Sequence, residues 1–149
     1  MLVLRSENGE LAYQTTGSAG VDVSTTGELV LLPGAVGRVG TGCYLESCSL
    51  PAELTFLGFE PVVKMYLRSS TPQKLGVGMA NSVAIIDSDY RGEIQIALYN
   101  FSDFSVVTIP AGTRIAQLIV EPVLKFDNVS VKEVERGAGG FGSTDKGGV

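Results

Sequence analysis

The sequence predicts an all-β domain, and three observations support this fold class. Apolar residues alternate or cluster over short stretches, glycine and proline are spread between those stretches, and no segment shows a sustained helical period. We therefore expect strands at Glu28–Leu32, Val36–Leu45, Leu54–Leu67, Glu93–Asn100, Ser105–Ile109, Arg114–Leu124 and Phe126–Val134.

Alternation is clearest in the segment from Glu93 to Asn100. Ile94, Ile96 and Leu98 fall on one face of a strand there, and the residues between them fall on the other face. This period of two predicts a strand with one face toward the core.

Turn signals separate the expected strands. Proline fixes its backbone and glycine tolerates unusual dihedral angles, so both residues favour turns and strand ends. The signals stand at Asn8-Gly9, at Leu32-Pro33-Gly34, between Ile109 and Gly112, and at Glu121-Pro122. One short helical turn is expected near Thr71–Lys74.

Length and composition predict one domain, which we assign to residues 1–135. The chain has 149 residues and a hydrophobic fraction of 44%, enough for one core. No apolar run approaches the roughly 18 residues of a membrane span, and the N-terminus does not read as a signal peptide. We therefore expect a soluble intracellular protein, in the cytoplasm or the nucleus. A net charge of −5 disfavours a nucleic-acid-binding surface.

The chain has no histidine and two cysteines, Cys43 and Cys48. These residues cannot complete a typical zinc site or a Cys-His catalytic pair, and we expect reduced thiols in the core or on the surface. Without histidine, proton abstraction must fall to Asp, Glu, Lys or Tyr.

Residues 136–149 differ in composition from the rest of the chain. Glycine dominates there, and Phe141 is the one large apolar side chain. Composition fits a flexible tail, because such a segment buries little surface. It also fits a mobile flap in which glycine amides and Arg136 contact a phosphate while Phe141 stacks on a base.

Polar side chains that are capable of catalysis or binding are concentrated between Asn81 and Glu93. From spacing alone this stretch is a hairpin with turn residues at Ser88, Asp89 and Gly92, or part of a site. Upstream, Arg68-Ser69-Ser70 offers a guanidinium and two hydroxyls to phosphate oxygens, although this triplet is common by chance.

Other candidate residues are individually unremarkable. Asp22 stands beside a glycine turn, Arg114 reads as a solvated cation, and Gln117 follows at the start of an expected strand. The phosphate loop GxxxxGK[ST], the dinucleotide motif GxGxxG and the hydrolase elbow GxSxG are absent from the sequence.

Taken in order, five segments resemble the five motifs of the trimeric dUTP pyrophosphatase (dUTPase) family, with matching spacing across nearly the whole chain. The segments are SAGVDV (Ser18–Val23), RSS (Arg68–Ser70), NSVAIIDSDYRGEI (Asn81–Ile94), GTRIAQLIV (Gly112–Val120) and RGAGGFGST (Arg136–Thr144). Five ordered matches are far more specific than any one of them.

The resemblance implies a jelly-roll-like β-barrel that assembles as a homotrimer with active sites shared between subunits. Each site would take its third motif from one subunit, its first, second and fourth motifs from another, and the glycine-rich arm, residues 136–149, from the third. The implied reaction is hydrolysis of dUTP to dUMP and pyrophosphate, which lowers dUTP and supplies dUMP for thymidylate synthesis. No nucleic acid or membrane partner is implied.

The resemblance also implies roles for single residues. Asp87 would activate a water for attack on the α-phosphorus, and Gln117 would position that water. Mg²⁺ would be held by the triphosphate and by waters, with no direct protein ligand. Asp22 would either hold a metal-bound water or orient an arginine.

The implied substrate-binding residues divide by the part of dUTP that they contact. Uracil would face Asn81, the stretch Ala84, Ile85 and Ile86, and the main chain of Gln95. Tyr90 would lie against the deoxyribose and exclude a 2′-hydroxyl. The triphosphate would be bound by Arg68, Ser69, Ser70 and Arg136, and the arm would close with Phe141, Gly142 and Ser143.

Two positions depart from the family pattern. Ala84 stands where glycine is common, so an added methyl group could crowd the backbone that faces uracil, and Ser70 often corresponds to glycine. Two alternatives stay open: a dCTP deaminase on the same fold, and a catalytically silent nucleotide-binding or regulatory module. The intact Asp87, Gln117 and Tyr90 favour an active enzyme.

Overall fold

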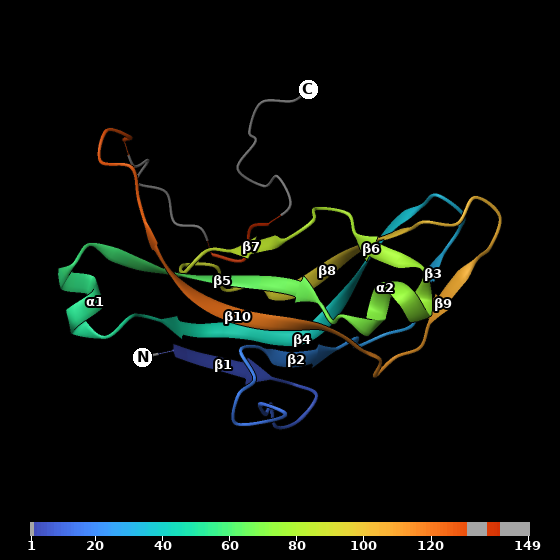
Figure 1. The fold of residues 1–149 in the computed structure, drawn as a ribbon, viewed down its shortest axis with the longest axis horizontal. Helices are drawn as coiled ribbons and strands as arrows, with labels where there is room; N and C mark the ends of the chain where they lie inside the picture. The colour runs from blue at the N-terminus through green and yellow to red at the C-terminus, as the bar shows by residue number, and fades with distance from the viewer. Residues whose placement is uncertain (1, 131–136, 141–149) are drawn as a thin grey trace.

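A computed structural model describes residues 2–130 and 137–140 of the chain. Within these residues β-strands make up most of the regular secondary structure, which confirms the predicted fold class (Figure 1). The strands are β1 (Leu2–Ser6), β2 (Val21–Ser24), β3 (Leu29–Leu31), β4 (Val36–Cys48), β5 (Phe59–Leu67), β6 (Val77–Met79), β7 (Ala84–Ile86), β8 (Glu93–Asn100), β9 (Val107–Ile109) and β10 (Arg114–Leu124), and the two short helices are α1 (Ala52–Phe56) and α2 (Ser70–Leu75).

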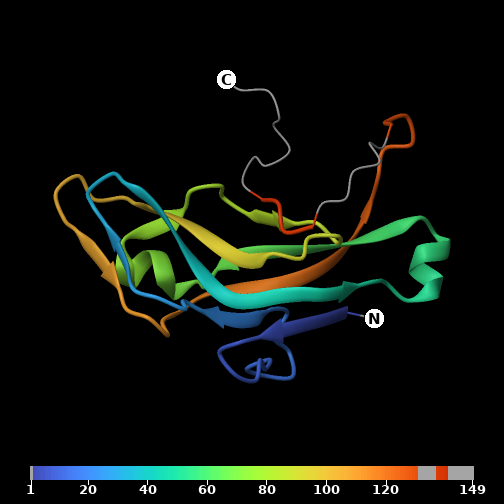
Figure 2. The same cartoon turned by 180° about the vertical axis from the view of Figure 1, so that it is seen from behind.

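The strands form two four-stranded sheets and a two-stranded ribbon, all antiparallel. The first sheet has the order β1-β4-β8-β6, the second has the order β2-β10-β5-β7, and β3 pairs with β9. Both views of the ribbon show the long strands of the two sheets running past each other across the molecule (Figures 1 and 2). This arrangement is the jelly-roll-like fold that the family resemblance implies.

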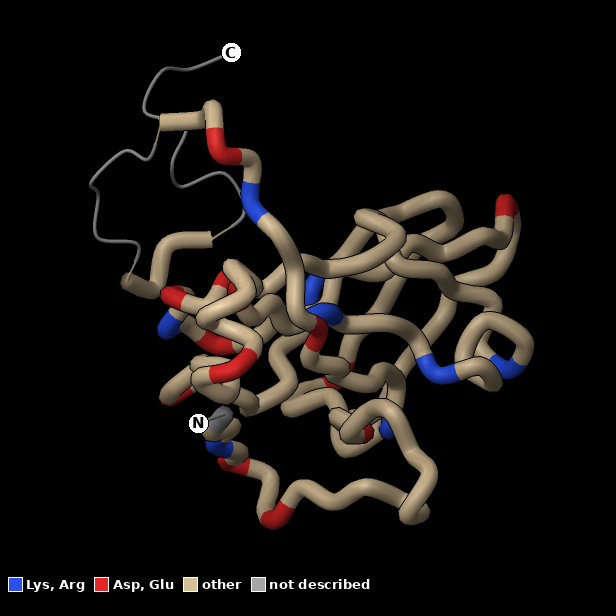
Figure 3. Tube along the Cα trace, turned by 60° about the vertical axis from the view of Figure 1, so that its left-hand side comes forward, with Lys and Arg blue, Asp and Glu red and all other residues tan. Residues whose placement is uncertain are grey.

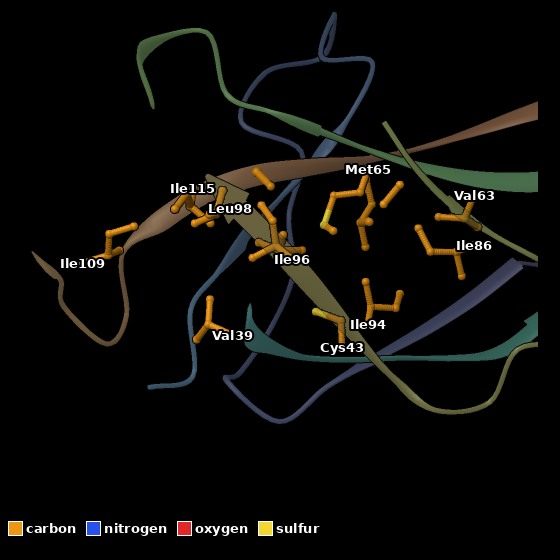
Figure 4. Close-up of a cluster of buried hydrophobic side chains, with 14 of the residues drawn as sticks. Val39, Cys43, Val63, Met65, Ile86, Ile94, Ile96, Leu98, Ile109 and Ile115 are labelled. Carbon is orange, nitrogen blue, oxygen red and sulfur yellow. The ribbon is translucent and has the colours of Figure 1, made fainter. Parts of the chain in front are cut away.

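One hydrophobic core lies between the two sheets. Met65 and Val63 of β5 meet Ile94 and Ile96 of β8 there, and all four side chains are buried (Figure 4). The alternation predicted for Glu93–Asn100 is confirmed, because Ile94, Ile96 and Leu98 are fully buried. Burying such side chains contributes about 1.5 to 3 kcal/mol each, so this interface supplies much of the driving force for folding.

Several predicted boundaries are confirmed and others are wrong. The strands at 93–100 and 114–124 and the helical turn near 71–74 occur as expected. The N-terminal part of the expected strand Leu54–Leu67 is instead the end of α1, because a short helix joins β4 to β5. Residues 126–130 form no strand, and residues 131–134 lie outside the described part.

Proline and short strands explain the remaining differences. The Glu121-Pro122 signal predicts a strand end, yet β10 continues to Leu124, with Pro122 directly opposite Pro61 of β5. Proline has no backbone N–H to donate, so two prolines can face each other where the ladder needs no hydrogen bond from either residue. The sequence pattern missed β1, β2, β6 and β7, whose alternation is too short to stand out from that of loops.

Both cysteines are free, as expected of reduced thiols. Cys43 is buried in β4, and this burial raises the pKa of its thiol. No helix among the described residues is long and apolar enough to cross a membrane. Lysine and arginine are scattered along the described trace and do not gather in one stripe (Figure 3).

Candidate active site

A cavity of about 200 Å³ opens where β7 and β8 diverge. Strand β7 pairs with β5, whereas β8 pairs with β4 and β6, so the two strands belong to different sheets. The hairpin alternative for this stretch is therefore wrong. The cavity is lined by Asn81, Ala84, Ile85, Ile86, Asp87, Tyr90, Ile94, Gln95 and Gly140.

A tight turn brings the chain into β7. Ser82 adopts a φ of 61°, in the left-handed region that non-glycine residues rarely occupy. The amide of Ser82 donates to the carbonyl of Met79 at 3.2 Å, and the amide of Val83 donates to that of Asn81 at 2.7 Å. These bonds hold Asn81 at the rim of the cavity, where backbone strain is a common feature of binding sites.

The chain leaves β7 at Asp87 through a second turn. The amide of Tyr90 donates to the Asp87 carbonyl at 3.1 Å, and the Arg91 guanidinium donates to the carbonyls of Ser88 and Tyr90, both at 2.9 Å. Asp87 is half-buried at the cavity wall. The turn thus presents one carboxylate to the cavity from a fixed backbone.

Tyr90 closes one side of the cavity. Its hydroxyl donates to the carbonyl of Glu93 at 2.9 Å. Its ring occupies the space beside Gly92, where an added Cβ would lie 2.4 Å from the Tyr90 hydroxyl. Gly92 is therefore needed for close approach of the ring to the backbone.

A second polar cluster lies on β2, β10 and the end of β5, around Asp22. Arg68 Nε lies 3.1 Å and Arg114 Nη1 lies 3.7 Å from Asp22 Oδ2. The Asp22 side chain is 12% exposed, and the Arg68 contact is not aligned as a hydrogen bond, so Oδ2 has no hydrogen-bond partner. The nearly buried carboxylate therefore holds two cations through charge attraction.

Gln117 joins this cluster through the register of β10. It lies directly opposite Asp22 of β2 and Tyr66 of β5, and it packs against Gly20. The register between β10 and β2 shifts between Arg114 and Ala116, so Ile115 and Ala116 are both buried. This bulge puts Arg114 on the same face as Gln117.

The segment Arg68-Ser69-Ser70 is anchored to β10 at its backbone. The Arg68 amide donates to the Ile115 carbonyl at 3.1 Å, and the buried Thr71 hydroxyl donates to the same carbonyl at 2.9 Å. The Ser69 hydroxyl is exposed and makes no capping bond to α2. The segment thus presents the Arg68 guanidinium and the Ser69 hydroxyl from an anchored backbone.

Within one chain, the structure does not bring Asp87 of the cavity close to Gln117 of the Asp22 cluster. Gln117 lies in β10, two strands from β7. The pairing of β10 with β5 and of β5 with β7 puts Gln117 level with Val83, four residues before Asp87. With strands about 4.8 Å apart and about 3.3 Å per residue, the Cα atoms of Asp87 and Gln117 lie roughly 16 Å apart. One water cannot contact both side chains of a single chain.

The expected arm residues are only partly described. Arg136, Phe141, Gly142 and Ser143 lie outside the described residues. The described part, residues 137–140, lies beside the cavity of its own chain (Figure 1): Gly140 lines it, and the Gly137 carbonyl accepts a hydrogen bond from the Arg91 amide at 3.0 Å.

Metal ligands are sparse in the described part of the chain. Residues 2–130 and 137–140 contain no cluster of three or more His, Cys, Asp or Glu side chains that could hold an ion.

Two residues of the Asp22 cluster were missed by the sequence analysis. These are Arg114 and Gln14, whose amide oxygen accepts a hydrogen bond from Arg114 at 3.2 Å. The bulge that turns Arg114 toward Asp22 leaves no sequence signal.

The sequence is similar to known dUTPases over most of its length. The dUTPase family model matches residues 9–145. The chain is 40% identical over 138 residues to the deoxyuridine 5′-triphosphate nucleotidohydrolase of Nautilia profundicola, covering 91% of this chain and 89% of that protein. It is 41% identical over 140 residues to the enzyme of the same name from Brucella melitensis, covering 89% of this chain and 82% of the relative.

Solved structures with a similar fold are also dUTPases. The dUTPase of Streptococcus mutans has a TM-score of 0.67 at 28% identity and covers 83% of this chain and 93% of that one. A Staphylococcus bacteriophage 80alpha dUTPase with dUPNHPP has a TM-score of 0.68 at 24% identity, covering 100% and 99%. A mutant dUTPase of phage phi11 of S. aureus, described with a structural Mg(II) ion, has a TM-score of 0.67 at 22% identity, covering 91% and 99%.

Proposed function

The chain belongs to the dUTPase family and hydrolyses dUTP to dUMP and pyrophosphate, and we propose that Asp87 activates the attacking water in a site shared between copies of the chain. The observation that supports sharing is the separation of Asp87 from Gln117, roughly 16 Å across the second sheet. Asp87 lines the cavity and Gln117 is half-buried beside Asp22, so a second copy can bring a Gln117 to each Asp87.

In this assembly a homotrimer forms with the cavity of one chain facing the Asp22 cluster of another. The cavity supplies Asp87 and the surfaces for base and sugar. The second chain supplies Arg68, Ser69, Ser70 and Gln117, and the arm of the third chain supplies Arg136, Phe141, Gly142 and Ser143. Closed symmetric assemblies of this kind are the rule for soluble homo-oligomers.

The chemical step is in-line attack of water on the α-phosphorus. Asp87 accepts a proton from the water as its oxygen bonds to phosphorus, and the bond from phosphorus to the bridging oxygen breaks to release pyrophosphate. The Asp87 carboxylate is suited to this step because the turn after β7 fixes its backbone at the cavity wall. Gln117 orients the water through its side-chain amide.

Charge on the triphosphate is balanced by arginines. Asp22 orients Arg68 and Arg114 through their charge contacts and leaves the remaining guanidinium donors of these residues for phosphate oxygens. This geometry favours the second of the two roles considered for Asp22, that of orienting an arginine. Positioning of this kind supplies most of the catalysis in phosphoryl transfer.

The residues of this site fit a Mg²⁺ ion that would bind together with the substrate. The described residues contain no carboxylate cluster, and Asp22 is already paired with arginines, so the triphosphate oxygens and waters would supply the ligands. When bound, the ion withdraws charge from the phosphates. The chain's own contribution is to hold the triphosphate through Arg68 and its neighbours.

Base recognition uses the backbone of β7 and β8. Asn81, Ala84, Ile85, Ile86 and Gln95 line the cavity, and fixed backbone donors and acceptors there discriminate uracil from cytosine, whose polarity is reversed at two positions. The methyl group of Ala84 belongs to the hydrophobic core, so this departure from the family pattern leaves the backbone accessible. Tyr90 lies against the deoxyribose.

Two variants test the catalytic and shared roles together. Asp87→Asn should bind a non-hydrolysable dUTP analogue but release pyrophosphate at a small fraction of the wild-type rate, because the water loses its base. Gln117→Ala should also be impaired. Refolding the two variants as a mixture should restore about a quarter of wild-type activity, since one site in four then combines an intact Asp87 with an intact Gln117 from another chain.

The matched control mixes Asp87→Asn with a chain that carries both substitutions, in which no site contains Asp87. A mixture of the single variants that stays as inactive as this control would show that the two residues do not meet across chains. Full turnover by Asp87→Asn would remove Asp87 from the mechanism.

A further inference from the structure

The carbonyl that holds Tyr90 belongs to a residue whose own side chain is anchored elsewhere. Glu93 begins β8, and its carbonyl accepts the Tyr90 hydroxyl. Its carboxylate Oε1 accepts a hydrogen bond from the amide of Gly42 in β4 at 2.8 Å. A single residue thus connects the wall of the cavity to a strand that does not line it.

The β4 segment beneath Glu93 is shaped to receive the carboxylate. The register between β4 and β8 shifts between Gly40 and Cys43, and Gly42 adopts a φ of 64°. This bulge turns the Gly42 amide toward Glu93. A Cβ at Gly40 would lie 2.1 Å from Glu93 Oε1, so the absence of a side chain there leaves room for the carboxylate.

A buried threonine secures the same junction from the other side. Thr41 is fully buried, and its hydroxyl donates to the carbonyl of Ile94 at 2.6 Å. Its own carbonyl accepts from the side-chain amide of Asn8 at 3.0 Å. Besides their pairing with Tyr44 and Cys43, the first two residues of β8 are therefore tied to the bulge of β4 by one carboxylate bond and one hydroxyl bond.

We propose that Glu93 is a positioning residue that fixes Tyr90 against the sugar and thereby sets the preference of the enzyme for deoxyribose over ribose. The inference rests on the role proposed above for Tyr90. Without the bond from Gly42, the backbone at Glu93 gains freedom, and the hydroxyl of Tyr90 loses a fixed acceptor. The ring can then retreat and admit a 2′-hydroxyl.

The first test measures the ratio of kcat/KM for dUTP to kcat/KM for UTP. Glu93→Ala removes the acceptor for Gly42, and the ratio should fall on the order of tenfold. Glu93→Gln keeps an acceptor oxygen of the same reach, and the ratio should stay within about twofold of wild type. A role limited to folding would lower the melting temperature of Glu93→Ala and leave the ratio unchanged, which would overturn the proposal.

Two further variants separate the bond from the loss of charge. Glu46→Ala removes an exposed carboxylate of β4 that pairs with Arg5, and its ratio should match wild type. Gly40→Ala leaves Glu93 in place but displaces its carboxylate from Gly42, and its ratio should fall as in Glu93→Ala. This second variant keeps the proposal testable if Glu93→Ala does not fold. An unchanged ratio in Gly40→Ala would contradict the bond's role.

A fluorine signal tests the positioning without any turnover. In protein labelled with 3-fluorotyrosine, the resonance of Tyr90 among the five tyrosines is assigned from Tyr90→Phe. It should move or broaden in Glu93→Ala and stay in place in Glu93→Gln and Glu46→Ala. An unmoved signal overturns the inference, whereas a wild-type protein that does not hydrolyse dUTP overturns the proposed function, so the two failures are distinguishable.

Discussion

Asp22 shows how a single side chain can organise a site without touching the reacting atoms. Its carboxylate is nearly buried, and it contacts the guanidinium groups of both Arg68 and Arg114 at Oδ2. A negative charge between two cations offsets their mutual repulsion and lets them lie close together. In the proposed site, Asp22 would therefore present these cations to a phosphate.

We expect Asp22→Asn to weaken substrate binding more than turnover. The amide keeps the shape of the side chain but loses the charge that holds Arg68 and Arg114, so the KM for dUTP should rise by about tenfold, with a smaller change in kcat. Steady-state kinetics of pyrophosphate release measures both constants. Glu46→Ala is a suitable control, because it removes an exposed carboxylate distant from this cluster. An unchanged KM in Asp22→Asn would contradict the role given to Asp22.

At the scale of elements, the divergence of β7 and β8 makes the cavity. Alternation predicted β8 to the residue, because an eight-residue strand carries a clear period of two. The same reasoning missed the three-residue β7 and left a hairpin with β8 as one of two alternatives. Strand pairing depends on which distant segment supplies a partner, and β7 finds β5 where local sequence suggests β8.

A second junction between elements depends on Asn100, at the end of β8. Its side chain is fully buried, and its amide nitrogen donates to the carbonyls of Leu31, Leu32 and Ser105. Its Oδ1 accepts from the Ser102 amide at 2.9 Å. One side chain thus joins β3 to the loop that leads into β9.

Asn100→Ala should destabilise the fold without altering the chemistry of the site. It removes the bonds to the backbone of Leu31, Leu32, Ser105 and Ser102, and the loss of each bond costs about 0.5 to 1.5 kcal/mol. Urea unfolding should show a lower midpoint, while the KM for dUTP stays close to wild type at low temperature. Thr108→Ala, at the exposed position of β9, is a matched control with little effect expected. An unchanged midpoint would show that waters replace these bonds.

At the scale of the whole molecule, the described part of the arm lies against the cavity of its own chain, whereas the proposed assembly uses the arm of another chain. Deleting residues 136–149 should leave a folded trimer, with a mass by light scattering just below three times the 15.6 kDa of the full chain, and greatly reduced turnover. The deletion removes Arg136 and Phe141 but none of the strands that the structure describes. A deleted chain with unchanged turnover would show that the arm has no part in catalysis.

Mixing the deleted chain with Asp87→Asn decides which chain the arm serves. If the arm acts on another chain, some sites combine an intact Asp87 with an arm from an Asp87→Asn chain, and activity returns. If the arm serves its own chain, where Gly140 now lies, every site lacks either the base or the arm and the mixture stays inactive.

The sequence by itself determined the fold class, the long strands, the absence of histidine chemistry and the order of the five motifs, because these depend on residue type and short-range periodicity. Only the tertiary structure decided that Arg114 turns toward Asp22, that β7 leaves β8, and that Asp87 lies far from Gln117 in one chain. Each of these depends on pairing between residues distant in sequence, where a one-residue bulge changes which side chains share a face.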